Sequence, residues 1–248
     1  MPSHKSLPAN VSLPAHPIAV SPARGQDKHT ALHIASAREF HRDALSVLNQ
    51  GHWAHAAGLL EVAAARLQTI PLAIVQLGRN HDRKPAAELA AEFLTLAAML
   101  LETAALQTSD TEKRALLLGL AARDWFASGT GKFVTDKALK LGNEAVEMLV
   151  TLSEEFHASG DEVHSIAMFE HSVSILGAIG ETPRQKTIAL MTARRYKELA
   201  TVAKEANDRS YTYYLGQSAI YYGMTDSPQV ARDAQTKFQN ELERVGRR

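Results

Sequence analysis

The stretch QGHWAHAAGLLEVA, residues 50–63, decides how this chain folds. It indicates a tight turn at Gly51 that opens the second helix of a helical hairpin, with an aromatic residue two positions after the glycine. Ala56, Leu60 and Ala63 follow at i, i+4 and i+7, so they share one helix face. Because two of the three are small, a neighbouring helix can approach that face closely. The stretch therefore predicts stacked pairs of helices.

The composition agrees with a helical protein and excludes several functional classes. Of the 248 residues, 45% are hydrophobic and only 6% aromatic, with alanine and leucine dominating. The 27 basic and 27 acidic residues give a net charge of 0, so a field that attracts nucleic acid or a membrane surface is not expected. The absence of cysteine rules out disulfides and thiolate metal sites. No apolar run approaches the ~20 residues of a membrane span.

Residues 1–26 form a separate region in front of the helical body, residues 27–248. Five prolines interrupt any helix there, and no acidic side chain precedes Asp27. We expect a disordered leader whose removal leaves stability nearly unchanged. It is either an extension without a function or an export or docking signal. Mitochondrial import is disfavoured, because Lys5 and Arg24 are its only basic residues.

The body carries helical periodicity almost without a pause. Glycines at positions 51, 160 and 180 mark helix ends, and Pro183 and Pro228 mark helix starts. Ser109 with Glu112 has the spacing of a capping box, and Thr135 suits a helix N-cap. These signals predict nine helices and no strand, at about 30–50, 52–70, 85–106, 110–126, 135–159, 161–179, 182–206, 208–222 and 227–248.

Comparison of the chain with itself reveals a repeated pattern around four turns, at Gly51, Asp110, Gly160 and Asn207. Large or apolar residues precede each turn by eleven positions, small residues precede it by seven, and two further small positions follow on the second helix. The four sets are Phe40, Met99, Leu149 and Tyr196; Ala44, Thr103, Ser153 and Ala200; Ala56, Ala115, Ser165 and Thr212; and Ala63, Ala122, Ser172 and Ala219.

This pattern resembles the tetratricopeptide repeat, best over residues 40–67 and 149–176 and more loosely over 37–222. The resemblance implies antiparallel helical hairpins stacked as an α-solenoid. The intervals between turns are 59, 50 and 47 residues, whereas the family repeats every ~34, so the repeats would be degenerate. Asp43 and Glu102 occupy a position that the family usually fills with leucine. A different α-solenoid or an irregular helical bundle therefore stays open.

A search for catalytic and metal-binding motifs gives little. His157, His164 and His171 recur every seven residues, but Gly160 interrupts the helix between the first two. Glu154 and His157 make one Glu-x-x-His, whereas a di-iron bundle needs two such pairs. We therefore expect solvated or helix-capping histidines, no catalytic residue, no metal and no cofactor.

All six tyrosines lie within 27 residues of the C-terminal half: Tyr196, Tyr211, Tyr213, Tyr214, Tyr221 and Tyr222. Tyrosine combines a large contact area with a polar tip and is common at interfaces. The rings either fill the core of the last hairpin or form a binding surface.

The resemblance implies a cytoplasmic protein- or peptide-binding module, an adaptor, chaperone-like protein or regulator without catalysis. Its partner would be a protein or peptide and not nucleic acid, and a homo-oligomer is compatible with it. One alternative is a secreted effector or regulator that carries an N-terminal export segment. Another is a helical enzyme or a protein that binds a small molecule or lipid.

In tetratricopeptide proteins the exposed faces of the first helices line the binding groove. Carried over by register, the candidate groove residues are Arg38, His41, Asn49, Ala97, Gln107, Glu147, Glu154, His157, Arg194, Lys197 and Lys204, with Tyr211 and Tyr214 beside them in the tyrosine-rich hairpin. This groove would be basic at both ends and acidic within the third hairpin. We expect the acidic part of a peptide to lie against Arg194, Lys197 and Lys204.

Overall fold

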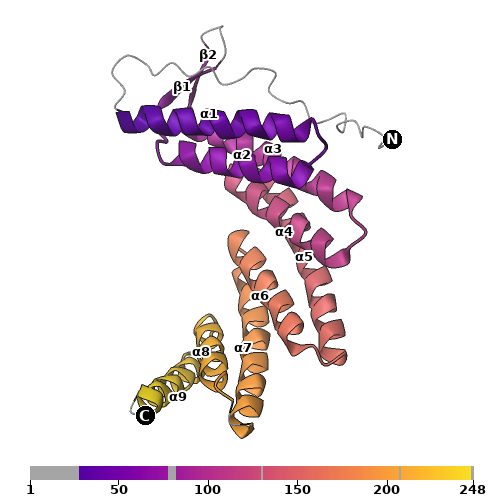
Figure 1. Cartoon of the computed structure of the whole chain (residues 1–248), viewed down its shortest axis with the longest axis vertical. Helices are drawn as coiled ribbons and strands as arrows, with labels where there is room; N and C mark the ends of the chain where they lie inside the picture. The colour runs from indigo at the N-terminus through magenta and orange to yellow at the C-terminus, as the bar shows by residue number, and fades with distance from the viewer. Residues whose placement is uncertain (1–27, 78–81, 130, 207, 247–248) are drawn as a thin grey trace. The chain divides into compact units, whose positions relative to one another are not determined.

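The structure, a computed structural model, describes residues 28–77, 82–129, 131–206 and 208–246 of the chain. Within these ranges it contains nine α-helices and two short strands, and consecutive helices pack as neighbours (Figure 1). The predicted all-α stack of helix pairs is therefore confirmed. The expected leader, residues 1–26, lies outside the described residues.

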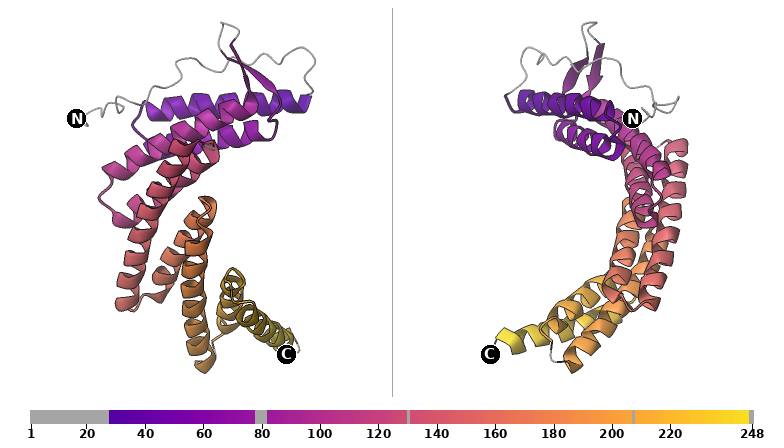
Figure 2. Two further views of the ribbon diagram at one scale, coloured as in Figure 1. Left: turned by 180° about the vertical axis from the view of Figure 1, so that it is seen from behind. Right: turned by 45° about the vertical axis from the view of Figure 1, so that its right-hand side comes forward.

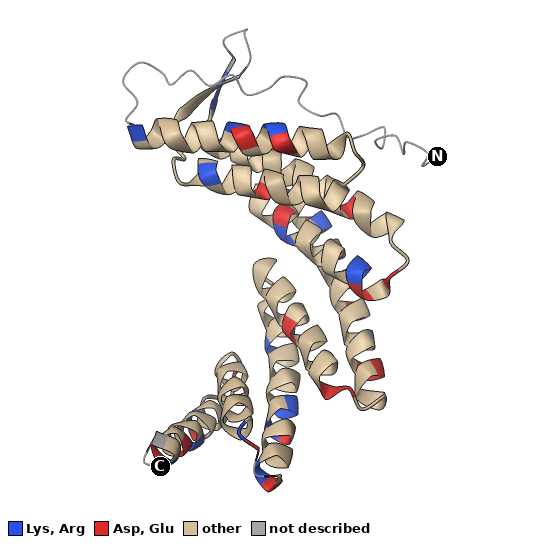
Figure 3. Cartoon of the chain, viewed as in Figure 1, with Lys and Arg blue, Asp and Glu red and all other residues tan. Residues whose placement is uncertain are grey.

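The chain divides into two compact units, Met1–Gly142 and Asn143–Arg248, where the sequence suggested one helical region. The boundary falls within a single long helix, α5 (Lys132–Ala158). Basic and acidic residues are interspersed along the helices of each unit (Figure 3). Each unit is described by itself below.

The first unit is built on α1 (Lys28–Leu48), α2 (Trp53–Gln68), α3 (Ala86–Gln107) and α4 (Thr111–Ser128), each packed against the next. Gly51 has a φ of 79°, a left-handed conformation that only glycine adopts without strain, so the turn between α1 and α2 forms where predicted. Ala56 and Ala63 are both 0% exposed. The small face of α2 is thus buried within the unit, as its spacing indicated.

Two short antiparallel strands lie between α2 and α3, so the prediction of no strand is wrong. In β1 (Ile74–Leu77) and β2 (Asp82–Pro85), Ile74 pairs with Pro85 and Leu77 with Asp82. Pro71 follows the end of α2 and prevents the helix from continuing, and the Ala86 N–H closes the hairpin by donating to the Ala73 carbonyl at 2.8 Å. The two strands project beyond α1 (Figure 2).

Helix α3 is the core helix of the first unit. It is 22 residues long, its most apolar 18-residue segment has a mean hydropathy of 1.7, and among the described residues it is the one helix long and apolar enough to cross a membrane. However, 56% of its most apolar segment is buried within the structure, and it packs against both α2 and α4. Its apolar character is therefore accounted for by packing inside the unit.

The second unit contains the later part of α5, followed by α6 (Glu162–Ala178), α7 (Thr182–Glu205), α8 (Tyr211–Gly223) and α9 (Pro228–Gly246). Helices α6 to α9 again pack each against the next. The core between α5, α6 and α7 comprises Val146, Phe169, Val173, Leu176, Ile188 and Ala189.

The hairpin of α5 and α6 is joined at the small positions of the repeat pattern. Ser153 and Ser165 are both 0% exposed. The Ser153 hydroxyl lies 2.9 Å from the Ser165 carbonyl oxygen and 3.0 Å from the Ser165 hydroxyl. Because a short side chain on each helix permits this contact, the two helices approach closely here.

Three helix starts differ from the sequence predictions. Asp110, not Ser109, caps α4, since its carboxylate accepts the Lys113 N–H at 3.0 Å. Helix α5 begins at Lys132, and Thr135 lies in its first turn with its N–H donating to the Gly131 carbonyl. Helix α7 begins at Thr182 itself, without a side-chain cap. Each observed helix start lies within three positions of the predicted one, which is the scale at which helix boundaries vary.

Candidate binding cleft

The basic residues of α7 fall into two groups. The helix carries six basic and two acidic residues. Near its start, Arg184 pairs with Glu147 at 2.9 Å and Lys186 pairs with Asp226. Further along, Arg194, Lys197 and Lys204 have no acidic partner among the described residues. The second half of α7 therefore presents unneutralised positive charge.

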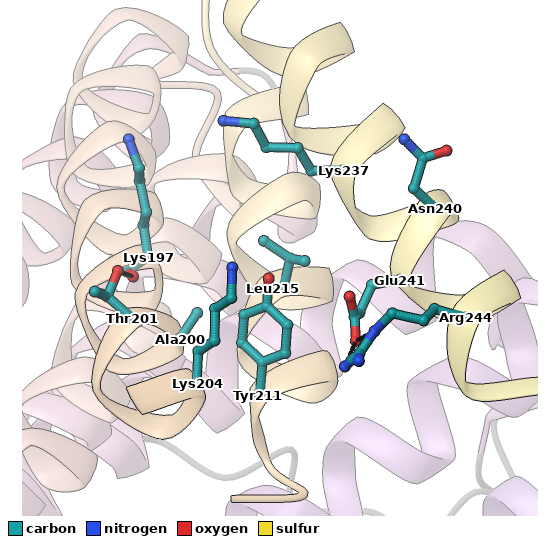
Figure 4. Close-up of a pocket in the computed structure, with 10 residues that line it drawn as sticks. All are labelled: Lys197, Ala200, Thr201, Lys204, Tyr211, Leu215, Lys237, Asn240, Glu241 and Arg244. Carbon is teal, nitrogen blue, oxygen red and sulfur yellow. Dashed lines mark hydrogen bonds and ion pairs between the residues drawn. The ribbon is translucent and has the colours of Figure 1, made fainter. Parts of the chain in front are cut away.

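An open cleft of about 530 Å³ lies in the second unit between this part of α7, helix α8 and helix α9 (Figure 4). Each helix contributes one face, because the residues lie at i, i+3, i+4 and i+7 on α7 and on α9 and at i, i+4 on α8. The lining residues are Lys197, Ala200, Thr201, Lys204, Tyr211, Leu215, Lys237, Asn240, Glu241 and Arg244.

The base of the cleft is apolar. Ala200 is 2% and Leu215 is 8% exposed, and α8 has no charged residue. The ring of Tyr211 lies beside them, and the ammonium of Lys204 is 5.7 Å from its centroid. This cation–π contact holds the lysine over the cleft without neutralising it.

The rim of the cleft is polar and mostly cationic. Lys237 extends from α9 toward α7, where Lys197 and Lys204 lie (Figure 4). Arg244 is engaged, because its Nε and Nη2 donate to the same oxygen of Glu241 at 2.8 and 2.5 Å. That contact raises the pKa of Arg244, so it stays charged. Four cations and one carboxylate thus line the cleft.

This arrangement suits a ligand that is anionic at one end and apolar at another. Three lysines without acidic partners supply ammonium donors, and Asn240 adds an amide. The Thr201 hydroxyl donates to the Lys197 carbonyl at 3.0 Å, so it can offer a ligand only its lone pairs. An apolar ligand group would contact Leu215, Ala200 and the ring of Tyr211.

The structure brings together three of the residues that the sequence singled out, Lys197, Lys204 and Tyr211. Sequence reasoning missed Lys237 and Arg244, because the repeat register assigns the groove to the first helices of the hairpins. A signal for them was present, since residues 237, 240, 241 and 244 form one polar face of the last helix. Arg194 is exposed on α7 but does not line the cleft.

The predicted groove residues of the first unit are only partly exposed. Arg38 on α1 and Asn49 after it are exposed, as is Gln107 at the end of α3. His41, in contrast, is 1% exposed and stacks on Phe93 with ring centroids 4.9 Å apart. Burial lowers its pKa, so it is a neutral core residue. Its placement on an exposed face is therefore wrong.

Ala97 is also wrong as a groove residue, because it is 0% exposed in the core of the first unit. It lies on α3, which is covered by α2 and α4. The repeat register had placed it on the open face of a first helix. On a helix packed on two sides, that face is itself buried.

The three candidates on α5 are exposed, and two of them are engaged. Glu147 binds Arg184, whereas Glu154 has no described partner. His157 contacts Glu162, and the Arg195 Nη1 lies 2.9 Å from its Nε2. The contacts of His157 thus join the end of α5 to the start of α6 and to the middle of α7.

Tyr214 belongs to a cluster of aromatic rings on α7 and α8, with Tyr196, Tyr213 and Tyr221. The hydroxyls of Tyr196 and Tyr221 both donate to one oxygen of Glu170, at 2.8 and 3.0 Å. Burial, and then Glu170, raise the pKa of Tyr196 and Tyr221 well above that of a free tyrosine. The core interpretation thus holds for Tyr196, whereas Tyr213 is 57% exposed.

A second polar cluster lies inside the first unit. Asp124 is 1% exposed, and its Oδ1 accepts the Arg123 Nε and Nη2 at 3.1 and 3.0 Å. The same Nη2 donates to Glu61 at 2.6 Å, and Asp124 Oδ2 has no partner. Burial and Glu61 raise the pKa of Asp124 to about 7, against the opposing effect of Arg123.

Among the described residues, no group of three or more histidine, aspartate or glutamate side chains is placed to hold a metal ion. His157 and His164 each contact an acidic residue near the start of α6.

The chain matches no known protein-family model, and no curated protein is significantly similar to it.

Proposed function

We propose that this protein is a tetratricopeptide-like helical-repeat module that binds an acidic segment of a protein or peptide in the cleft between α7, α8 and α9. The observation that carries the proposal is the set of three lysines without acidic partners above an apolar base. The ligand's acidic side chains would pair with Lys197, Lys204 and Lys237. One apolar side chain would rest on Leu215 and Tyr211.

The packing of the repeat positions supports the repeat assignment. In the repeats around Gly51, Asp110 and Gly160, both small positions of the second helix are buried: Ala56 and Ala63, Ala115 and Ala122, and Ser165 and Ser172. Ser153 and Ser165 meet directly across their hairpin. Small residues at the points where hairpins pack are the feature on which the resemblance rests.

The charge distribution supports an acidic partner. The chain as a whole has no net charge, so a local excess of cations is a property of this cleft. Exposed cations of this kind contribute mainly to the association rate and the orientation of a ligand. Affinity would come from the apolar contact at the base.

Reversing the charge of the cleft tests this function. The double variant Lys197→Glu with Lys204→Glu should no longer capture the natural partner in affinity purification. The double variant Arg194→Glu with Lys197→Glu should also lose this capture. The matched control, Lys113→Glu with Lys140→Glu, changes the same charge at exposed positions of the first unit and should capture it normally. Circular dichroism should give the same helical content for all three. Undiminished capture by Lys197→Glu with Lys204→Glu, both of which line the cleft, would rule the cleft out.

A second candidate is the binding of a small amphipathic anion, because the volume of the cleft is in the range of small-molecule sites. At about 530 Å³ it lies within the ~300–1,000 Å³ of small-molecule sites. A fatty-acid or aryl phosphate would then saturate the cleft and displace an acidic peptide. Binding of such a compound without any peptide binding would favour this candidate over the first.

A further inference from the structure

Two histidines on the outer surface of the first unit are arranged as a chelate. His29 and His33 lie at i and i+4 on the first two turns of α1, so they share one face. Their Nε2 atoms are 3.1 Å apart, and their ring centroids are 4.4 Å apart. This is the spacing at which the two histidines of the His-Glu-x-x-His motif hold one zinc ion on a helix. Here no glutamate follows His29, so the pair offers ligands without a general base.

The hydrogen bonds of Thr69, at the end of α2, fix the proton of His33. The Thr69 hydroxyl donates its single hydrogen to the Arg66 carbonyl at 2.7 Å. It must therefore accept from His33 Nδ1, which lies 3.0 Å away. With the proton on Nδ1, neutral His33 presents a lone pair at Nε2, directly toward His29. A hydrogen bond to the other ring nitrogen is also what orients histidine ligands in metal sites.

The distance between the two nitrogens matches a shared ion. With metal–nitrogen bonds of ~2.0–2.1 Å, two ligands at a right angle are ~2.8–3.0 Å apart, and at a tetrahedral angle ~3.3–3.4 Å. The observed 3.1 Å lies between these values. Without an ion, His29 Nε2–H donates to His33 Nε2. On binding, the proton of His29 moves through solvent to its Nδ1, so both Nε2 lone pairs face the ion.

We propose that His29 and His33 form a two-histidine site for a divalent transition-metal ion, such as Zn²⁺ or Cu²⁺, with water completing the coordination. These ions bind imidazole readily, whereas Mg²⁺ and Ca²⁺ prefer oxygen ligands. Because Thr69 belongs to α2, it couples the orientation of the ligand to the neighbouring helix. The site is independent of the acidic-peptide cleft, which lies in the other unit.

The test is calorimetric titration of the full chain with Zn²⁺ and, separately, with Cu²⁺ and Mg²⁺. We expect one site that binds Zn²⁺, binds Cu²⁺ more tightly and does not bind Mg²⁺. His29→Gln and His33→Gln should each lower the Zn²⁺ affinity at least tenfold. Thr69→Val keeps both imidazoles but removes the acceptor of the Nδ1–H, and should lower it by about 10-fold or more.

The control variant is His55→Gln with His171→Gln, which removes two exposed histidines from other helices. It should bind Zn²⁺ as the parent does. In spectra of the histidine side chains, Zn²⁺ should shift the signals of His29 and His33 before those of any other histidine. The proposal is overturned if the parent binds no Zn²⁺, or if His29→Gln with His33→Gln binds it as tightly as the parent.

Discussion

Asp124 is a buried carboxylate whose protonation is coupled to the folded state. Two carboxylates, its own and that of Glu61, share the guanidinium of Arg123, and Asp124 Oδ2 is buried without a partner. One cation cannot neutralise both acids, and burial disfavours the charged form. The pKa of Asp124 therefore rises to about 7 from 3.8.

A raised pKa sets the direction of the pH dependence. The neutral form is favoured in the folded chain, so this group's contribution to stability is present below pH ~4 and is lost as the pH rises through about 7. Asp124→Asn carries a neutral amide at every pH, and it can still accept from Arg123 and donate to Glu61. We expect the variant to be more stable than the parent at pH 8, by on the order of a few kcal/mol of unfolding free energy. At pH 5.5 this advantage should be smaller, because Asp124 is then mostly neutral in the folded parent.

Urea unfolding of both chains at pH 5.5 and pH 8 measures this difference. Asp136→Asn, at an exposed position on α5, is the control and should follow the parent at both values. If the unfolding free energy of Asp124→Asn also equals that of the parent at both pH values, the pKa of Asp124 is not raised in the folded chain.

Among the elements, α2 is the one whose packing tests the repeat pattern. Ala56 and Ala63 are fully buried, so Ala56→Leu or Ala63→Leu inserts a larger side chain at a close helix contact. We expect each variant to lose roughly 1–3 kcal/mol of unfolding free energy. Gly58, in the same helix, has no atom within 4 Å of an added Cβ. Gly58→Ala should therefore stabilise the chain, by up to about 1 kcal/mol.

Thermal unfolding of the three variants compares these effects directly. If the two leucine variants melt with the parent, the alanines do not pack against a neighbouring helix and the register is wrong. A destabilised Gly58→Ala would point to a contact at that position that the structure lacks.

The helices could be predicted because their signals are local, while other elements depend on distant contacts. Apolar spacing and the glycine turns place every helix to within a few residues. The strand Asp82–Pro85 has three polar or charged residues and no alternation, so only its pairing with Ile74–Leu77 defines it. His41 was misplaced for a similar reason, since a polar residue on a helix indicates solvent until Phe93 from α3 covers it.

The same distinction applies to the site. Lys197 and Lys204 were found because they stand on the first helix of a repeat, whose exposed face can be inferred from the register. Lys237 and Arg244 lie on a helix outside the four repeats, and only the packing of α9 on α8 brings them to the cleft. That packing depends on Gly216, where a Cβ would lie 2.9 Å from the Phe238 ring.

For the molecule as a whole, a chain without net charge presents a locally cationic cleft within an all-α stack. Specific binding of an acidic peptide there should differ from general charge attraction in two ways. It should require an apolar side chain in the peptide, because the base of the cleft is apolar. It should weaken with added salt without vanishing, since the apolar contact is not screened.

The most direct test is a nuclear magnetic resonance titration of the full chain, labelled with ¹⁵N, with a short peptide of glutamates around one leucine. The account predicts saturable shifts of the backbone amides of Lys197, Thr201, Lys204, Tyr211 and Lys237, and none with the peptide in which lysines replace the glutamates. Shifts confined to the first unit or to α5, or equal shifts with both peptides, would contradict it.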